Sequence, residues 1–307
     1  MVRALEYKKP KGSAHKKKVM EALTGWLFVA PLIIGILLFL AFPLGYAAVI
    51  SFTDTEATFE GSSFVGFENY ITAFEEPLFM QGMINVLITC LGVPIGIFIA
   101  VILTNLLVSN PKGSIIFKSI FYVPTICGSI AIAFIWQSMY AQGYGVINQT
   151  LKNLGWITTD INFISDKNFL LSMIIMGVWA GLGTSILLLF AALKGVNKQL
   201  YEAASIDGAN FLQKFRYITL PALSPTIFYI LVTGISGSLQ EFSRFQAMAG
   251  SHGTPEWAMS PVWFIYIRTA NNFRGQAAAC GIILGVFILI ISAFQFVGSR
   301  LWVNYDS

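Results

Sequence analysis

The chain has 307 residues, a mean hydropathy of +0.70, 56% hydrophobic residues and only 11% charged residues. Soluble domains carry about 25% charged residues, so this composition excludes an ordinary soluble protein and is typical of an integral membrane protein. The net charge of +4 does not indicate a nucleic-acid surface, because the basic residues are sorted by segment along the chain. The three cysteines lie singly in apolar runs, a pattern that favours neither a disulfide framework nor a metal site.

The segment 1–25 forms a basic N-terminal tail, with seven Lys or Arg among its first 20 residues. The apolar run that follows has about 25 residues, whereas the hydrophobic region of a signal peptide has about 7–15. We therefore interpret this run as a first membrane span, with Pro31 and Pro43 as expected kinks. The tail itself is most simply a topology determinant that is attracted to anionic membrane lipid.

Five further apolar runs are long enough to cross about 30 Å of hydrocarbon, which takes roughly 20 residues. Helices are the only form that such single runs can take in lipid, because they satisfy their own backbone amides. We predict an all-α membrane domain over residues 26–307 with six transmembrane helices, at approximately 26–52, 82–108, 115–140, 169–193, 225–248 and 277–301. The apolar run within 256–270 is too short to span and predicts an interfacial or re-entrant helix.

Basic residues fix the orientation of these spans. With the N-terminus inside, the cytoplasmic segments and their rims hold fourteen of the nineteen Lys and Arg. The first outer loop, 53–81, has six acidic residues and no basic one. Positive charge accumulates on the cytoplasmic side of membrane proteins, so both termini and the polar segment 198–225 are predicted to be cytoplasmic.

The segment 198–225 reads as two short helices joined by a bend. Gly208 is the residue at which the backbone most easily leaves helical geometry, and Asn210 with Gln213 three residues on predicts a capping box. Pro221 is expected to end the second helix, and Ser224 with Pro225 to open the next span. An ordinary amphipathic helix–turn–helix between two spans would show the same features.

The spacing within this segment, KQLYEAASIDGANFLQKFRYITLPALSP, resembles the EAA loop of permease subunits of binding-protein-dependent ABC sugar importers. Phe67–Tyr70 and Phe121–Pro124 also look like segments of these sugar permeases, whereas Val86 and the turn 249–255 depart from the family pattern. The resemblance implies the ABC importer permease fold, with loop 195–222 as a coupling loop that docks on an ATPase subunit. The residues that match the motif, and so are implied in coupling, are Glu202, Ala203, Ala204, Asp207, Gly208, Ala209, Phe215, Leu220 and Pro221.

Polar side chains within the spans are the candidates for a substrate path, because burying them in lipid is costly unless they face a cavity. Small polar residues equally allow membrane helices to pack closely, so a packing role remains the alternative for each. The candidates are Asn85, Trp136, Trp179, Thr184, Ser236, Ser238, Gln240 and Glu241. No nucleophile–base pair, metal-ligand cluster or G-x-x-x-x-G-K-[ST] phosphate loop occurs, so we expect no catalytic site, no metal and no bound ATP in this chain.

The resemblance further implies a multi-pass subunit of a prokaryotic cell membrane that moves a carbohydrate, an oligosaccharide or a glycoside. Its implied partners are a second homologous permease, two ATPase subunits that bind ATP and Mg²⁺, and an extracellular solute-binding protein. Uptake of glycerol phosphate, which the same family performs, is a rival; Arg244 is the only basic residue near a span's outer end, which favours a neutral sugar. A standalone secondary carrier, an intramembrane enzyme and a membrane scaffold that only binds partners are further alternatives.

Overall fold

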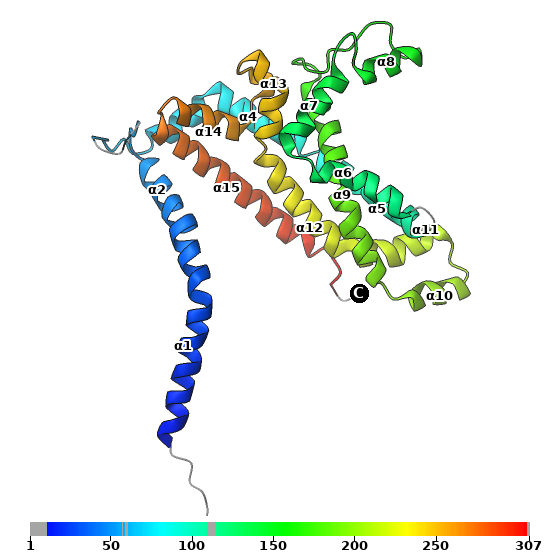
Figure 1. The fold of residues 1–307 in the computed structure, drawn as a ribbon, viewed down its shortest axis with the longest axis horizontal. Coiled ribbons are helices and arrows are strands. Elements are labelled where there is room, and N and C mark those ends of the chain that lie inside the picture. The colour runs from blue at the N-terminus through cyan, green and yellow to red at the C-terminus, as the bar shows by residue number, and fades with distance from the viewer. Residues whose placement is uncertain (1–10, 57, 59–60, 110–113, 306–307) are drawn as a thin grey trace, which may run out of the picture.

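The structure is a computed structural model that describes residues 11–56, 58, 61–109 and 114–305. Within these ranges the regular elements are helices, and one isolated β-bridge joins Thr53 to Phe64. Figure 1 shows a long helical arm beside a tilted bundle of helices. The predicted all-α membrane fold is therefore confirmed.

The first span forms the arm. It runs through α1 (Lys11–Ile36), a π-helical turn (Leu37–Ala41) and α2 (Phe42–Ile50), and it stands apart from the bundle over most of its length (Figure 1). No residue in its most apolar stretch is buried against the rest of the chain. Pro31 lies inside α1 and Pro43 near the start of α2, on either side of the π-helical turn. Only the outer end of the arm reaches the bundle, where α2 packs against α15.

The next helices lie between the arm and residue 198 in the sequence. They are α3 (Glu68–Glu75), α4 (Pro77–Thr89), α5 (Gly92–Ser109), α6 (Ser114–Ile126), α7 (Ser129–Tyr140), α8 (Val146–Asn153) and α9 (Phe169–Gly195). α4 and α5 together form the second span, and α9 forms the fourth span and packs against both α5 and α6.

The third span is not the continuous helix that we predicted over 115–140. α6 and α7 meet at an angle of 112°, with the break at Cys127 and Gly128. Pro124 removes one backbone donor near the end of α6, and Gly128 has an extended backbone that starts α7. The six predicted spans thus correspond, in the described part of the chain, to five long helices and this bent pair.

The C-terminal half continues with α10 (Lys198–Ile206), α11 (Phe211–Lys214), a π-helical turn (Phe215–Thr219), α12 (Leu220–Leu239), α13 (Ser243–Ala249), two short 3₁₀ turns (Gly250–His252 and Glu256–Ala258), α14 (Pro261–Ala270) and α15 (Arg274–Ser299). α14 is the short outer helix predicted within 256–270, and it packs against α4 and α15.

Three predictions about span five are wrong. Ser224 and Pro225 do not open the span, because both lie inside α12. Pro221 does not end a helix, because α11, the π-helical turn and α12 form one continuous helix from Phe211 to Leu239. The π-helical turn directly precedes α12, so Pro221, which cannot donate a backbone hydrogen bond, falls in the first turn after it. The span also ends at Leu239 rather than at 248, since the chain breaks at Gln240 and restarts as α13.

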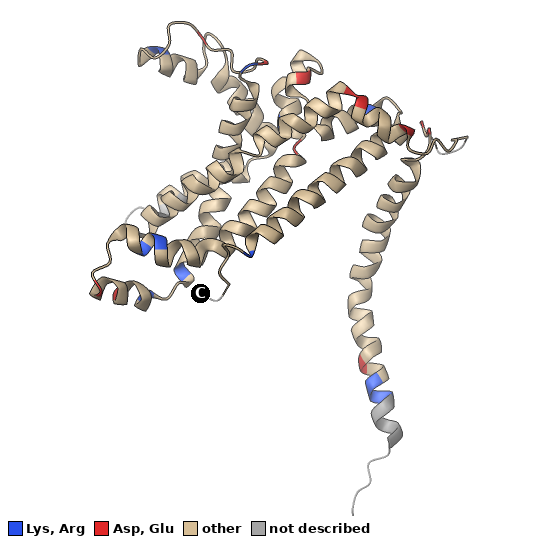
Figure 2. Cartoon of the chain, turned by 180° about the vertical axis from the view of Figure 1, so that it is seen from behind, with Lys and Arg blue, Asp and Glu red and all other residues tan. Residues whose placement is uncertain are grey.

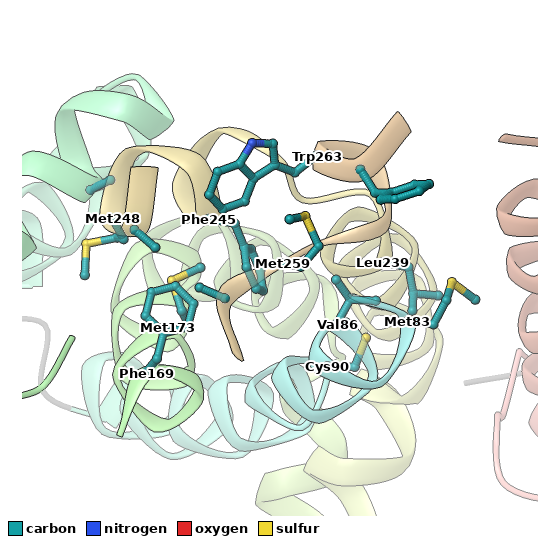
Figure 3. Packing of buried hydrophobic residues seen from close by; sticks show 14 of the residues in the cluster. Met83, Val86, Cys90, Phe169, Met173, Leu239, Phe245, Met248, Met259 and Trp263 are labelled. Carbon is teal, nitrogen blue, oxygen red and sulfur yellow. The ribbon is translucent and has the colours of Figure 1, made fainter. Parts of the chain in front are cut away.

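Buried apolar side chains form two separate clusters. The outer core joins α4, α7, α9, α13 and α14 through large residues such as Phe169, Phe245 and Met248, whose packing is drawn in Figure 3. The inner core joins α5, α9 and α12 through residues such as Ile186 and Leu223. Both α9 and α12 contribute to the two clusters and therefore link them.

Figure 1 shows α10, the chain's C-terminal end and the start of α1 on the same side, and α8, α13 and α14 on the other. Lys and Arg lie at the start of α1 and around α10 and the beginning of α12 (Figure 2). The fold therefore places the described parts of the predicted cytoplasmic segments on one common side, as the distribution of basic residues requires. Residues 1–10 of the basic tail and residues 110–113 lie outside the described residues.

Candidate functional site

A cleft of about 440 Å³ lies between the two cores. Ile132, Met173 and Phe245 from the outer core line it on one side, and Ile97 and Ile230 from the inner core line it on the other. Helices α5, α6, α7, α9, α12 and α13 all contribute, and the break in the third span faces it through Cys127 and Ser129. The cleft therefore lies within the membrane domain, beside the break in the third span and the end of α12.

One charged pair faces the cleft. The Glu241 carboxylate accepts a hydrogen bond from the backbone N–H of Arg244 at 3.1 Å and from its Nε at 2.8 Å, and it forms an ion pair with Nη2. The guanidinium extends across to α9, where a Cβ on Gly177 would meet Nη1 at 3.8 Å. Both side chains are partly buried, and each charge is neutralised by the other within the wall of the cleft.

The rest of the lining is uncharged and combines apolar side chains with glycines and hydroxyl groups. Among the described residues, Glu241 and Arg244 are the only ionisable Asp, Glu, Lys, Arg or His side chains that face the cleft. The buried Thr125 Oγ1 has no hydrogen-bond partner within the described structure. Besides the apolar side chains, the wall contains these glycines and hydroxyl residues: Thr89, Gly92, Gly96, Ser129, Gly177, Gly181, Ser185, Thr233, Gly234, Gly237 and Ser238. Such a surface can hydrogen-bond a hydroxyl-rich molecule and leaves room for it to approach the backbone.

The structure brings only two of the predicted path residues to this cleft, Ser238 and Glu241. Asn85 is buried and its amide donates to Glu256 O and Met259 O, both at 2.9 Å, so it ties α4 to the segment before α14. The remaining five candidates lie outside the lining: Trp136, Trp179, Thr184, Ser236 and Gln240.

The two tryptophans pack against each other instead. Trp136 and Trp179 make an edge-to-face contact with ring centroids 5.7 Å apart, and Trp136 belongs to the outer core. Sequence reasoning missed Arg244 and Thr125 as residues of the cleft. The Glu241–Arg244 spacing of three residues, and Pro124 followed closely by Gly128, were the signals that could have indicated them.

We call residues 195–222, which the resemblance implies in coupling, the coupling segment. Its first helix, α10, ends in a Schellman motif. Gly208 has φ +77°, its N–H donates to Ser205 O at 3.2 Å, and the N–H of Ala209 donates to Ala204 O at 2.8 Å. This pattern needs a residue with positive φ after the helix, which explains why Gly208 follows Asp207. The capping box of Asn210 and Gln213 is present as predicted and opens α11.

The side chains of this segment divide into an exposed and an anchored set. Glu202, Ala203, Asp207 and Gly208 are exposed on the inner side of the molecule. Phe215 and Leu220 pack against the inner core. The segment therefore exposes its acidic end, while Phe215 and Leu220 fix its other end to the bundle.

Two contacts join α10 to the long helix that follows. Tyr201 Oη and Thr219 Oγ1 share a hydrogen bond of 2.9 Å, and Lys214 Nζ donates to Ser205 Oγ at 2.7 Å. Thr219 is buried at the base of α12. These bonds join α10 to the start of α12, whose other end borders the cleft.

Residues 92–300 match the family described as "Binding-protein-dependent transport system inner membrane component". The chain is 32% identical over 296 residues to the probable ABC transporter permease protein YesP of Bacillus subtilis, covering 94% of each chain. It is 29% identical to the lactose transport system permease protein LacF of Rhizobium radiobacter, covering 91% of this chain and 94% of LacF. It is 31% identical to the arabinooligosaccharides transport system permease protein AraP of Bacillus subtilis, covering 87% and 85%.

The fold matches a subunit of a bacterial ABC transporter that imports the acidic polysaccharide alginate. The TM-score is 0.79 at 24% sequence identity, with 95% of this chain and all of the other covered. The extent of the family match, the identity to YesP and the arrangement of the spans agree with one another. The chain therefore belongs to the binding-protein-dependent transport system inner membrane components, the multi-pass membrane subunits of bacterial ABC transporters.

Proposed function

We propose that this chain is a permease subunit of an ATP-driven importer of a carbohydrate, an oligosaccharide or a glycoside. Two relatives, LacF and AraP, are named for lactose and arabinooligosaccharide transport, which supports a sugar as the cargo class. The observation that carries the proposal is the cleft, whose wall contains many hydroxyl groups and glycines and is formed in part by α12, the helix that follows the coupling segment.

Energy would come from two ATPase subunits that bind ATP and Mg²⁺, one of them docked on the coupling segment of this chain. Glu202 and Asp207 are exposed there, and carboxylates at such a position suit Arg or Lys on a partner. Movement of α10 would pass through Tyr201 and Thr219 to α12 and alter the cleft. In this mechanism the spans alternate between inward- and outward-open arrangements.

A second, homologous permease would complete the membrane assembly. The apolar side chains of the arm formed by α1 and α2 are not covered by the rest of this chain (Figure 1). They are suited to pack against the spans of a second permease. The substrate would then pass between the two permeases. A structural neighbour is a bacterial alginate ABC transporter in complex with a substrate-bound periplasmic protein, which supports delivery by an extracellular solute-binding protein here.

The cleft favours a neutral sugar. Its single cationic group, Arg244, is matched by Glu241, so an anionic cargo such as a glycerol phosphate would find no uncompensated positive charge in the described lining. Neutral hydroxyl groups would instead bond to the hydroxyl and backbone groups of the wall, among them Ser238 and Thr233.

Co-purification with the ATPase tests the coupling proposal. The tagged chain is expressed with its partner permease and ATPase, as wild type and as Glu202→Ala, Gly208→Val and Gly208→Asn. Gly208→Val should release the ATPase because a β-branched residue resists positive φ, whereas Gly208→Asn should retain it because asparagine tolerates that backbone region. Equal ATPase recovery for all of the variants would show that the segment does not dock the ATPase.

A further inference from the structure

The last described residues of the chain lie against the base of α12. Beyond α15 the chain makes one more turn, in which the N–H groups of Trp302 and Val303 donate to Ser299 O at 3.1 and 2.9 Å. The backbone N–H of Asn304 then donates to Ser224 Oγ on α12 at 2.9 Å. The segment that follows α15 is therefore joined to α12, eighty residues away in sequence.

Aromatic packing reinforces this joint. Phe228 is buried, and its ring makes edge-to-face contacts with Phe296 of α15 at 5.2 Å and with Trp302 at 6.0 Å between centroids. Two such contacts on one ring stabilise the packing beyond the effect of the apolar area that they bury. They therefore hold α12 and α15 at one relative position. We call residues Phe296, Trp302, Asn304, Ser224 and Phe228 the inner brace.

The inner brace touches the coupling segment directly. Ser224 is 4% exposed, and its hydroxyl donates to Pro221 O at 2.7 Å while it accepts from Asn304. Pro221 is a residue of the coupling motif, at the start of the helix that α10 would push. The segment after α15 is thus bonded to the start of α12, close to Thr219, which α10 contacts through Tyr201.

α15 in turn supports the outer layer of the molecule. It packs against α14 and α3 and holds α2, all of which lie toward the outer side in Figure 1. A helix that is fixed to α12 at its inner end, and to α14 and α3 at its outer end, forms a continuous connection between the coupling segment and the outer face.

We propose that the inner brace makes α12 and α15 move as one body, so that motion of the coupling segment reaches the outer layer through α15. This inference rests on the proposed coupling function and adds positioning residues to it. Ser224, Phe228 and Trp302 act through the helices that they join, and none of them lines the cleft. Without the brace, α12 would move when the ATPase subunits close, whereas α15 would keep its position, and the distance between the two helices would change.

The test measures the distance between the two helices in the whole transporter. Spin labels are placed on exposed positions of α12 and α15, at Tyr229→Cys and Val297→Cys, in a Cys127→Ser background that removes the exposed native thiol. Pulsed electron paramagnetic resonance then gives the label distance with the ATPases nucleotide-free and trapped with ATP and vanadate. The inference requires one narrow distribution with the same mean in both states.

Two variants release the brace and two serve as matched controls. Trp302→Ala and Ser224→Val should broaden and shift the distribution in the trapped state, because loss of an aromatic contact or a buried hydrogen bond raises the released population by about tenfold. Trp302→Phe keeps an aromatic ring and should behave as wild type. Leu301→Ala alters a neighbouring side chain that is 90% exposed and should also have no effect.

The outcomes separate the inner brace from the function on which it rests. A wild-type distance that changes between the two states, or a Trp302→Ala distance that stays narrow and unshifted in an assembled transporter, would overturn the brace alone. Loss of ATPase binding in Trp302→Ala would also overturn it, because the brace is argued to act after docking. Absence of any ATPase from the wild-type complex would overturn both proposals.

Discussion

Glu241 and Arg244 neutralise each other inside the cleft. The carboxylate accepts from the backbone N–H of Arg244 at 3.1 Å and from Nε at 2.8 Å, so one acidic side chain holds both the start of α13 and the only cationic group of the described lining. This pairing leaves the wall without net charge beside the break between α12 and α13. Under the proposed function, this pairing favours a neutral cargo over an acidic one.

Glu241→Gln should shift the preference of the transporter toward acidic sugars. The guanidinium of Arg244 would lose its charged partner, and a charge-assisted bond from it to a carboxylate is worth about 1–2 kcal/mol more than a bond to a neutral hydroxyl. We expect the affinity for a uronate-containing oligosaccharide, relative to its neutral counterpart, to rise by about tenfold. Competition binding to the purified permease pair measures this ratio. Glu256→Gln, which removes an exposed carboxylate outside the cleft, is the control and should leave the ratio unchanged.

Tyr201→Phe should weaken the mechanical link between α10 and α12. The change removes only the hydroxyl that shares a 2.9 Å hydrogen bond with Thr219, a contact worth about 1 kcal/mol. We expect about a fivefold loss in ATPase affinity or in coupled hydrolysis, measured by titrating the ATPase onto the reconstituted permease. Tyr217→Phe removes a hydroxyl from a side chain that is 75% exposed and should match wild type. Equal behaviour of the two variants would show that the Tyr201 bond carries no coupling.

Gly183→Ala should destabilise the contact between α6 and α9. A Cβ there would lie 2.3 Å from Phe121 O and 2.6 Å from Thr125 Oγ1, so the two helices would have to separate. Overpacking of this kind costs about 1–3 kcal/mol. Gly181→Ala, two residues away, meets no atom within 4 Å and is the matched control. Thermal unfolding of the purified complex in detergent should show a lower midpoint for Gly183→Ala alone.

Asn85→Ala should act on stability rather than on substrate choice. The side chain is 1% exposed, and it supplies both donors to Glu256 O and Met259 O. Removing them leaves two backbone acceptors unsatisfied, at a cost of about 1–3 kcal/mol. Gln81→Ala, which removes only a donor to the Asn85 side chain, should cost less. If Asn85→Ala changed the sugar preference and left the thermal stability unaltered, Asn85 would instead belong to the substrate path.

The outer lobe around α8 should weaken in acid. The ammonium of Lys152, followed by the backbone N–H of Gly143, holds the pKa of Asp160 below its ordinary value of 3.8. A carboxyl with a lowered pKa contributes stability fully above that ordinary value and loses the contribution as the pH falls through its folded-state pKa. Hydrogen exchange over residues 141–165, corrected for intrinsic rates, should differ between wild type and Asp160→Asn at neutral pH and converge in strong acid. A difference that persisted in acid would contradict this account.

The sequence by itself determined the class of fold, the number of spans and the sidedness. Each of these follows from local quantities: the length of an apolar run, the position of Lys and Arg, and the capping residues Asn210 and Gln213. Gly208 was also readable, because a Schellman motif depends only on a few consecutive residues.

Only the tertiary structure decided which polar residues meet at the cleft. A helical span exposes residues on every face, and the packing of α5, α9 and α12 selects which face is turned inward, so Ser238 reaches the cleft while Thr184 does not. The break of the third span and the joining of Asn304 to Ser224 likewise depend on partners far away in sequence. Local patterns specify the helices, whereas long-range packing specifies what those helices place side by side.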